Sequence, residues 1–274
     1  MQPTEQDLAV VSAQVDRARR LRLAGMLVLF LIAALVALAQ GTFVDLPTKL
    51  VAFAILAMGL IAAWRGGAVE RARALFRLGK IKADGLAASA LLNRGDFEGA
   101  RRTYAALLPI TRPLAGYHAM HVLLYGVTCF LVGDKPAGLS LTRRVLASEW
   151  HLRPRMDAFR DLAETWHVFM LLDAGDVAEA KKVIEARPAA LGLGTARAAL
   201  ALHEERWEDA LHEAHRALGE AGFPKASRPT IAALGLFAAK KLGRYEVVSA
   251  FEALLAAEPL SLAAKENPAL KKYW

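Results

Sequence analysis

The sequence predicts an all-α chain, in which a two-helix transmembrane hairpin near the amino terminus is followed by a solenoid of paired helices. Two observations lead to this prediction. Two apolar runs lie close together before residue 65, and a helix–turn–helix motif recurs several times after residue 82. With 274 residues the chain is long enough for one or two domains. Its hydrophobic share of 55% exceeds that of an ordinary globular protein.

The apolar runs, residues 23–39 and 50–64, define the expected hairpin, which we place at 23–64. The first run is about the length that crosses a bilayer core, and residues 43–47 extend the second to a similar length. Asp45, Pro47 and Lys49 suit a turn between the two helices. A cleaved signal peptide is one alternative, which the second apolar run disfavours. A hairpin buried in a soluble core is the other, which the cationic flanks disfavour.

The net charge of +8 is concentrated in the first third of the chain. Residues 1–82 hold 11 Lys and Arg against 5 Asp and Glu, a net +6, whereas residues 83–274 hold 24 against 22, a net +2. The near-balanced repeats disfavour nucleic-acid binding. Cations on both outer flanks predict that the amino terminus and the repeats are cytoplasmic.

The basic flanks, residues 1–22 and 65–82, have an apolar residue every three or four positions. We expect a basic amphipathic segment and a basic juxtamembrane helix there, although solvated linkers would give the same pattern. The cations expected to contact lipid are Arg17, Arg19, Arg20, Arg22, Arg65, Arg71, Arg73 and Arg77.

A turn motif organises the rest of the chain. Residues 92–100 read LNRGDFEGA and residues 172–180 read LDAGDVAEA, with weaker copies at 132–137, 205–210 and 242–247. Glycine is suited to ending one helix, and the polar residues after it favour the start of the next. Five residues after each turn stands Ala100, Gly138, Ala180, Ala210 or Val248. Four of these five are small, which allows paired helices to approach closely.

This pattern resembles the tetratricopeptide repeat (TPR) family over residues 83–259, with four to five repeats. The resemblance implies a right-handed α-solenoid, with residues 260–274 as a carboxyl-terminal cap or tail. The chain departs from the family in its turn spacings of 38, 42, 30 and 38 residues and in lacking the family's early tryptophan. Two spans followed by repeats are similar in layout to the bacterial inner-membrane protein family associated with haem biosynthesis.

The inner face of such a solenoid binds partner proteins, so the resemblance implies a groove formed by the first helix of each repeat. The expected lining residues are Met120, Leu123, Val127, Phe130, Leu131, Leu162, Phe169, Leu172 and Phe237. They are mostly apolar, which suits an amphipathic helix rather than the peptide carboxylate that some family members clamp. The alternative is that the first repeat or the carboxyl-terminal segment covers them.

No pattern in the sequence points to catalysis. A phosphate-binding loop and a recognisable nucleophile–base motif are both missing. The pairs His118/His121 and His212/His215 have a spacing that can hold a metal, but without a supporting motif we expect neither a metal nor a cofactor. The single cysteine, Cys129, lies in an apolar run, which is typical of a buried structural thiol.

We therefore expect a non-enzymatic, membrane-anchored TPR-like scaffold at the cytoplasmic face of a bacterial inner membrane. Its partners would be the lipid bilayer and a protein, with no nucleic acid. Three alternatives stay open: a structural subunit whose groove is permanently occupied, a haem- or metal-handling protein that uses the histidine pairs, and repeats that face the periplasm.

Overall fold

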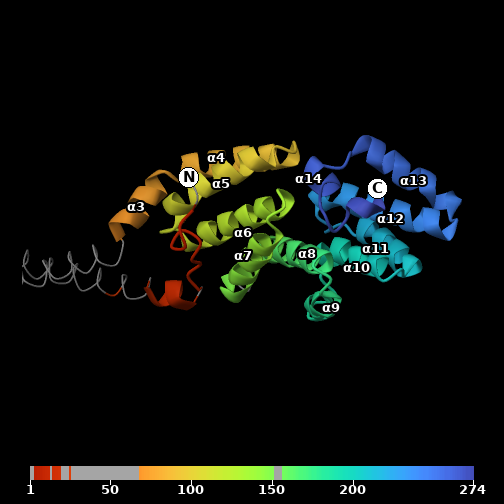
Figure 1. Ribbon diagram of the computed structural model, residues 1–274, viewed down its shortest axis with the longest axis horizontal. Helices are drawn as coiled ribbons and strands as arrows, with labels where there is room; N and C mark the ends of the chain where they lie inside the picture. The colour runs from red at the N-terminus through yellow and green to blue at the C-terminus, as the bar shows by residue number, and fades with distance from the viewer. Residues whose placement is uncertain (1–2, 13, 20–24, 26–67, 151–155) are drawn as a thin grey trace, which may run out of the picture.

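The computed structural model describes residues 3–12, 14–19, 25, 68–150 and 156–274 (Figure 1). Throughout this part the regular structure is helical, and no residue in it lies in a strand. The helices are α3 (Ala68–Phe76), α4 (Leu78–Asn93), α5 (Phe97–Thr111), α6 (Ala115–Leu131), α7 (Lys135–Ala147), α8 (Asp157–Asp173), α9 (Val177–Glu185), α10 (Gly194–His203), α11 (Trp207–Gly219), α12 (Arg228–Leu242), α13 (Tyr245–Ala257) and α14 (Leu262–Lys265). Short 3₁₀ helices lie at η2 (Leu191–Leu193), η3 (Lys225–Ser227) and η4 (Lys271–Tyr273).

The predicted membrane hairpin needs correction. Among the described residues no helix is both long and apolar enough to span a membrane. Residues 23–64, to which we assigned the hairpin, lie outside the described part except for Gly25. We therefore correct the fold class to all-helical over the described residues, with no membrane-spanning hairpin found among them, and we withdraw the two-span inner-membrane location that depended on it.

The solenoid segment is built from helical hairpins. The pairs α4–α5, α6–α7, α8–α9, α10–α11 and α12–α13 each enclose one copy of the turn motif. The turn residue has a positive φ in every pair: Gly95 (83°), Gly133 (100°), Gly175 (79°), Glu205 (59°) and Gly243 (68°). Glycine adopts this left-handed conformation without a steric penalty, which explains why the motif selects it in four of five turns.

The helix after each turn begins with a cap in the first three hairpins. Asp96, Asp134 and Asp176 each accept a hydrogen bond from the backbone amide three residues later, at 2.8, 3.3 and 3.3 Å. These bonds satisfy an amide that the helix itself leaves unpaired. Arg206 and Arg244 occupy the same position in the last two hairpins and make no such bond.

Small residues set how closely the paired helices approach. A Cβ atom on Gly138 of α7 would lie 2.8 Å from Phe130 Cβ and 2.9 Å from the carbonyl oxygen of Gly126 on α6. Ala88 and Ala100 are fully buried between α4 and α5. A larger side chain at these crossings would force the helices apart.

The described amino-terminal residues lie against the first repeats. Only residues 14–19 and 25 are helical among the described residues before α3. The Trp150 indole donates a hydrogen bond to the carbonyl oxygen of Val11 at 2.7 Å, and Asp16 pairs with Arg71 at 2.6 Å. Glu5 pairs with Arg144 of α7 at 2.9 Å. These contacts attach residues 3–19 to α3, α7 and the segment after α7.

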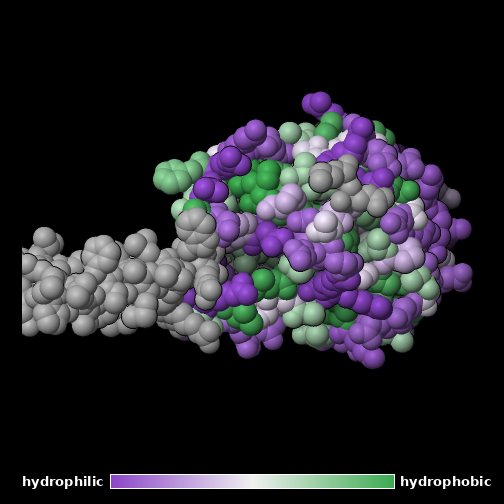
Figure 2. Space-filling model, turned by 60° about the vertical axis from the view of Figure 1, so that its left-hand side comes forward, coloured by the Kyte–Doolittle hydropathy of each residue, from purple (hydrophilic) through white to green (hydrophobic). Residues whose placement is uncertain are grey.

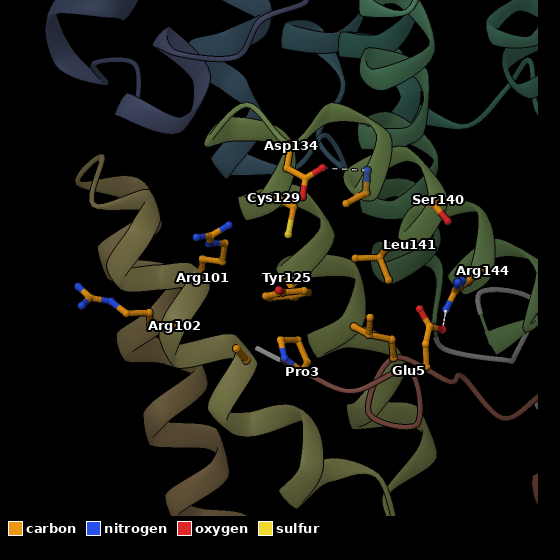
Figure 3. A pocket seen from close by; sticks show the side chains of 13 residues that line it. Pro3, Glu5, Arg101, Arg102, Tyr125, Cys129, Asp134, Ser140, Leu141 and Arg144 are labelled. Carbon is orange, nitrogen blue, oxygen red and sulfur yellow. Dashed lines mark hydrogen bonds and ion pairs between the residues drawn. The ribbon is translucent and has the colours of Figure 1, made fainter. Parts of the chain in front are cut away.

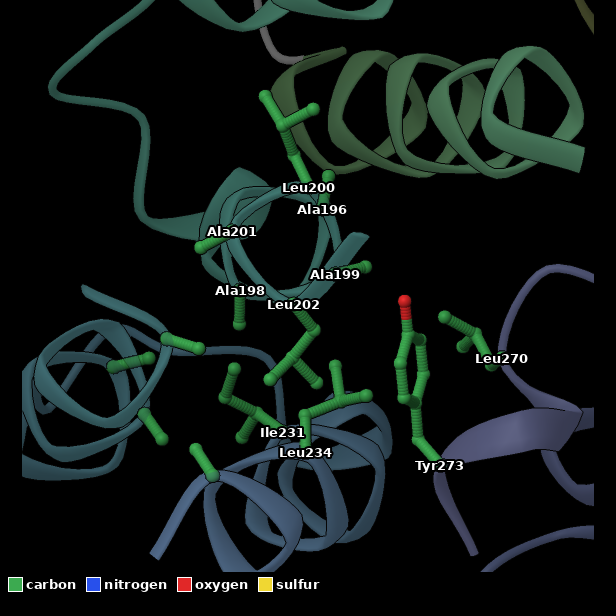
Figure 4. Packing of buried hydrophobic residues seen from close by; sticks show 14 of the residues in the cluster. Ala196, Ala198, Ala199, Leu200, Ala201, Leu202, Ile231, Leu234, Leu270 and Tyr273 are labelled. Carbon is green, nitrogen blue, oxygen red and sulfur yellow. The ribbon is translucent and has the colours of Figure 1, made fainter. Parts of the chain in front are cut away.

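The carboxyl-terminal segment, residues 259–274, folds back across the solenoid. Helix α14 lies beside the end of α4 (Figure 1), where Leu262 sits over the turn glycine Gly95. Further along, Leu270 and Tyr273 pack beside α10 and α12 (Figure 4). The segment therefore contacts both the first and the last hairpin.

Candidate functional site

The residues predicted to line the inner groove are largely core. Leu123, Val127, Phe130, Phe169 and Leu172 are buried in the hydrophobic clusters between the helices. The other four, Met120, Leu131, Leu162 and Phe237, are half-buried.

Part of the inner face is covered by the chain itself. The Tyr273 ring lies 5.2 Å from the Phe237 ring, at an interplanar angle of 65°. Trp207 contacts the same phenylalanine, with its ring centroid 5.9 Å away. The carboxyl-terminal segment therefore packs against Phe237. This agrees with the alternative that the segment covers part of the inner face.

An open groove lies at the other end of the solenoid, between α3 and α4 on one side and α6 on the other. Its volume is about 1130 Å³. We call it the α4–α6 groove. The buried lining residues are Ile81, Leu114, Ala115, His121 and Trp150. The exposed apolar lining residues at its edges are Leu75, Leu86 and Tyr117, whose exposed fractions are 53%, 72% and 40%. The half-buried Met120 also lines it.

The α4–α6 groove is thus an apolar depression with exposed apolar edges. Figure 2 shows that apolar side chains on one face of the molecule gather in patches between polar ridges. Isolated exposed leucines are ordinary, but several that surround one hollow are typical of a binding surface.

Unpaired cations lie on the helices that form one wall of the groove. Arg73, Arg77, Lys80 and Lys82 are exposed and make no ion pair within the described residues. Lys82 lines the groove itself. Helices α3 and α4, together with Arg77 between them, carry five Lys and Arg against Glu70 and Asp84. This wall therefore presents a net positive charge.

The arginines expected to contact lipid have different surroundings in the structure. Arg71 pairs with Asp16 and donates a hydrogen bond to the carbonyl oxygen of Pro113 at 3.1 Å. Arg17 and Arg19 are exposed, as are Arg73 and Arg77. Arg20, Arg22 and Arg65 lie outside the described residues.

His121 is the polar side chain on the floor of the groove, and it is 5% exposed. Burial, and to a lesser degree the nearby His118, lower the pKa of His121 to about 4. Its imidazole is therefore neutral at physiological pH. Next to it, Ser89 Oγ and Tyr104 Oη are hydrogen-bonded to each other at 2.8 Å.

A smaller cavity of about 370 Å³ lies under the amino-terminal residues, between α5, α6 and α7 (Figure 3). Cys129 and Tyr125 face it from α6, and Arg101 faces it from α5. Burial raises the pKa of the Cys129 thiol to about 11, so the thiol is protonated at neutral pH. A protonated thiol is a poor nucleophile and a poor metal ligand.

A third cavity, of about 790 Å³, is polar and lies beside α9, α10 and α11. Its charged groups neutralise one another: Arg197 pairs with Glu213 at 2.9 Å, and Glu204 pairs with both Lys181 and Arg206. This cavity therefore leaves little uncompensated charge for a ligand.

The histidine pairs do not form a metal site in the structure. His118 and His121 are both buried, and His118 Nδ1 lies 3.2 Å from Thr111 Oγ1. His212 and His215 are exposed on α11. Among the described residues no group of three or more His, Cys, Asp or Glu side chains is arranged to hold a metal ion.

Comparison with known proteins gives no relative. No protein-family model, no curated protein and no solved structure matches the chain significantly. The candidate site therefore rests on the geometry of this chain alone.

Proposed function

We propose that this chain is a non-catalytic helical-repeat scaffold of the TPR kind, and that it binds a partner protein in the α4–α6 groove. The observation that supports this most directly is the apolar groove with its exposed edges, Leu75, Leu86 and Tyr117. Leaving such side chains in water forgoes the free energy that their burial would contribute, about 25 cal/mol per Å² of apolar surface.

An amphipathic helix fits the groove better than a small molecule does. The volume of about 1130 Å³ slightly exceeds the range of about 300–1,000 Å³ that is usual for small ligands. A small molecule on the floor would leave Leu86 and Tyr117 exposed. A helix lying between α4 and α6 would cover the floor and the edges together, as in other helix-in-groove complexes.

The positive charge of this wall limits which partner helices would bind well. Arg73, Arg77, Lys80 and Lys82 have no anionic partner among the described residues. Acidic side chains on the flank of the incoming helix would complement them, which speeds association and disfavours basic competitors. We therefore propose an amphipathic partner helix with an apolar face and an acidic flank.

The test is a crosslinking pull-down with the full chain from its own cells. Phe130 and Phe169 are unsuitable targets because both are core residues. Leu86→Asp changes a side chain that is 72% exposed, so the fold is retained, and Tyr245→Asp on α13 is a control of equal exposure. A partner retained by wild type and Tyr245→Asp but lost with Leu86→Asp supports the proposal. Identical partners in all three samples would refute it.

A further inference from the structure

His121 on the floor of the groove has an unusual setting. Its ring faces α4 at Gly85, and a Cβ atom on Gly85 would lie only 3.2 Å from His121 Nε2. Both residues line the groove. The missing side chain at position 85 thus leaves space directly beside this nitrogen.

The imidazole makes no hydrogen bond within the described part of the chain. Nδ1 is fully enclosed and unpaired, and no described residue bonds to Nε2. The Tyr104 ring centroid lies 6.2 Å from the His121 ring, and the Tyr104 hydroxyl is hydrogen-bonded to Ser89. Nδ1 is enclosed and out of reach of a ligand, whereas Nε2 lies beside Gly85 and is the ring nitrogen that a group entering the groove can pair with.

The surroundings determine which group could pair with it. The ring is neutral at physiological pH, because burial lowers the pKa of His121 to about 4. A carboxylate at this depth would lose its hydration without gaining a cation, since Lys82 is exposed at the rim and Arg71, which also lines the groove, is paired with Asp16. A neutral amide or hydroxyl loses less hydration and can donate to or accept from the imidazole.

We propose that His121 is the specificity-determining residue of the α4–α6 groove, and that the partner helix inserts one amide or hydroxyl side chain, from an otherwise apolar face, against Nε2 beside Gly85. This inference rests on the proposed function and adds a recognition rule to it. Acidic residues of the partner lie at the rim, and one neutral polar residue reaches the floor.

The test compares two designed helical peptides with the full-length chain. Both carry leucines on one face and glutamates on the flanks, and they differ at one central apolar position, which is Gln in one and the similarly shaped Met in the other. Binding is measured by fluorescence anisotropy of the labelled peptides. We expect wild type to bind the Gln peptide about tenfold more tightly, because the Met peptide leaves the imidazole unpaired.

Two variants assign the preference to the floor of the groove. Gly85→Ala places a methyl group in front of Nε2 and should remove the preference for Gln while retaining binding of the Met peptide. His121→Leu should reverse the preference. Gly79→Ala adds the same methyl group to α4 where no atom lies within 4 Å, so it should keep the wild-type preference. Because the readout is a ratio between two peptides on one protein, a partial loss of folded protein does not mimic the result.

Three results would overturn the inference. Equal binding of the two peptides to wild type would remove any role for His121 in specificity. A preference that persists in Gly85→Ala and His121→Leu would place the recognition elsewhere. Binding of the apolar dye anilinonaphthalene sulfonate that Leu86→Asp abolishes, without binding of either peptide, would assign the groove to a small molecule. The first two results contradict only the role of His121. If the pull-down still shows a partner that Leu86→Asp loses, the proposed function remains supported.

Discussion

Truncation of Leu270 to alanine tests whether the carboxyl-terminal segment is an integral part of the core. Leu270 is 1% exposed and packs with Tyr273 in the cluster that joins α8, α10 and α12. Leu270→Ala removes buried carbon groups worth about 0.8 kcal/mol each, and the cavity left behind adds to that loss. We expect the free energy of unfolding to fall by about 3 kcal/mol, within the range of about 2–5 kcal/mol found for buried leucines.

The assay is urea unfolding followed by circular dichroism, with Leu86→Ala as the matched control. That variant loses the same atoms from a side chain that is 72% exposed, so its free energy of unfolding should change by less than about 0.5 kcal/mol. Equal transitions for the two variants would mean that residues 259–274 contribute nothing to the folded core, and the account of the covered inner face would be wrong.

Three further predictions follow from burial, close contact and capping. Burial lowers the pKa of His118, His121 and His167 from 6.5 to about 4, so the unfolded chain takes up protons first as the pH falls. Stability is fully present above about pH 6.5 and should fall between pH 6.5 and 4, by on the order of 3 kcal/mol for His167, as measured by urea unfolding across that range. Gly235→Ala places a Cβ atom 2.7 Å from Ala214 Cβ and Phe251 Cζ, and should lower the free energy of unfolding by about 1–3 kcal/mol, which thermal unfolding would show as a lower midpoint. Asp176→Ala removes the cap of α9 and should cost about 1 kcal/mol in chemical unfolding.

Each of these predictions has a control. His167→Gln should make the decline of stability with falling pH shallower than it is in the wild type. Gly79→Ala should not destabilise, because no atom lies within 4 Å of the new methyl group. Asp84→Ala changes an acidic residue inside α4 with no capping bond and should cost less than Asp176→Ala. A result in the opposite order for any pair would contradict the reason given for it.

The local sequence pattern predicts most of the helical hairpins and their turns. Gly95, Gly133, Gly175 and Gly243 stand at turns with a positive φ, which glycine adopts without a steric penalty. The turn at Glu205 has the same conformation without glycine, and there only the position within the repeated pattern identified it. Helix α4 begins at Leu78, before the start of the first repeat at residue 83 that the family pattern implied.

The candidate site was less accessible to prediction because it depends on contacts between distant segments. The inner-face positions follow from the repeat register, but the register says nothing about the docking of residues 259–274 over Phe237. Likewise, Leu75 belongs to α3, before the repeats, yet it forms an edge of the groove. The apolar pattern of α3 by itself predicts a helix at a membrane surface. The sequence pattern gives no role to Gly85, because its closeness to His121 depends on how α4 packs against α6.

The contact between Leu262 and Gly95 changes how the two ends of the row of helical hairpins unfold. In an open solenoid each repeat touches only its neighbours, so either end can fray independently and stability is close to a sum over units. Here a residue after the last hairpin rests on the turn of the first, so opening one end also removes a contact from the other. The closing contact also forms late in synthesis. The first hairpin can form early on the ribosome, but it gains this neighbour only after Leu262 has emerged.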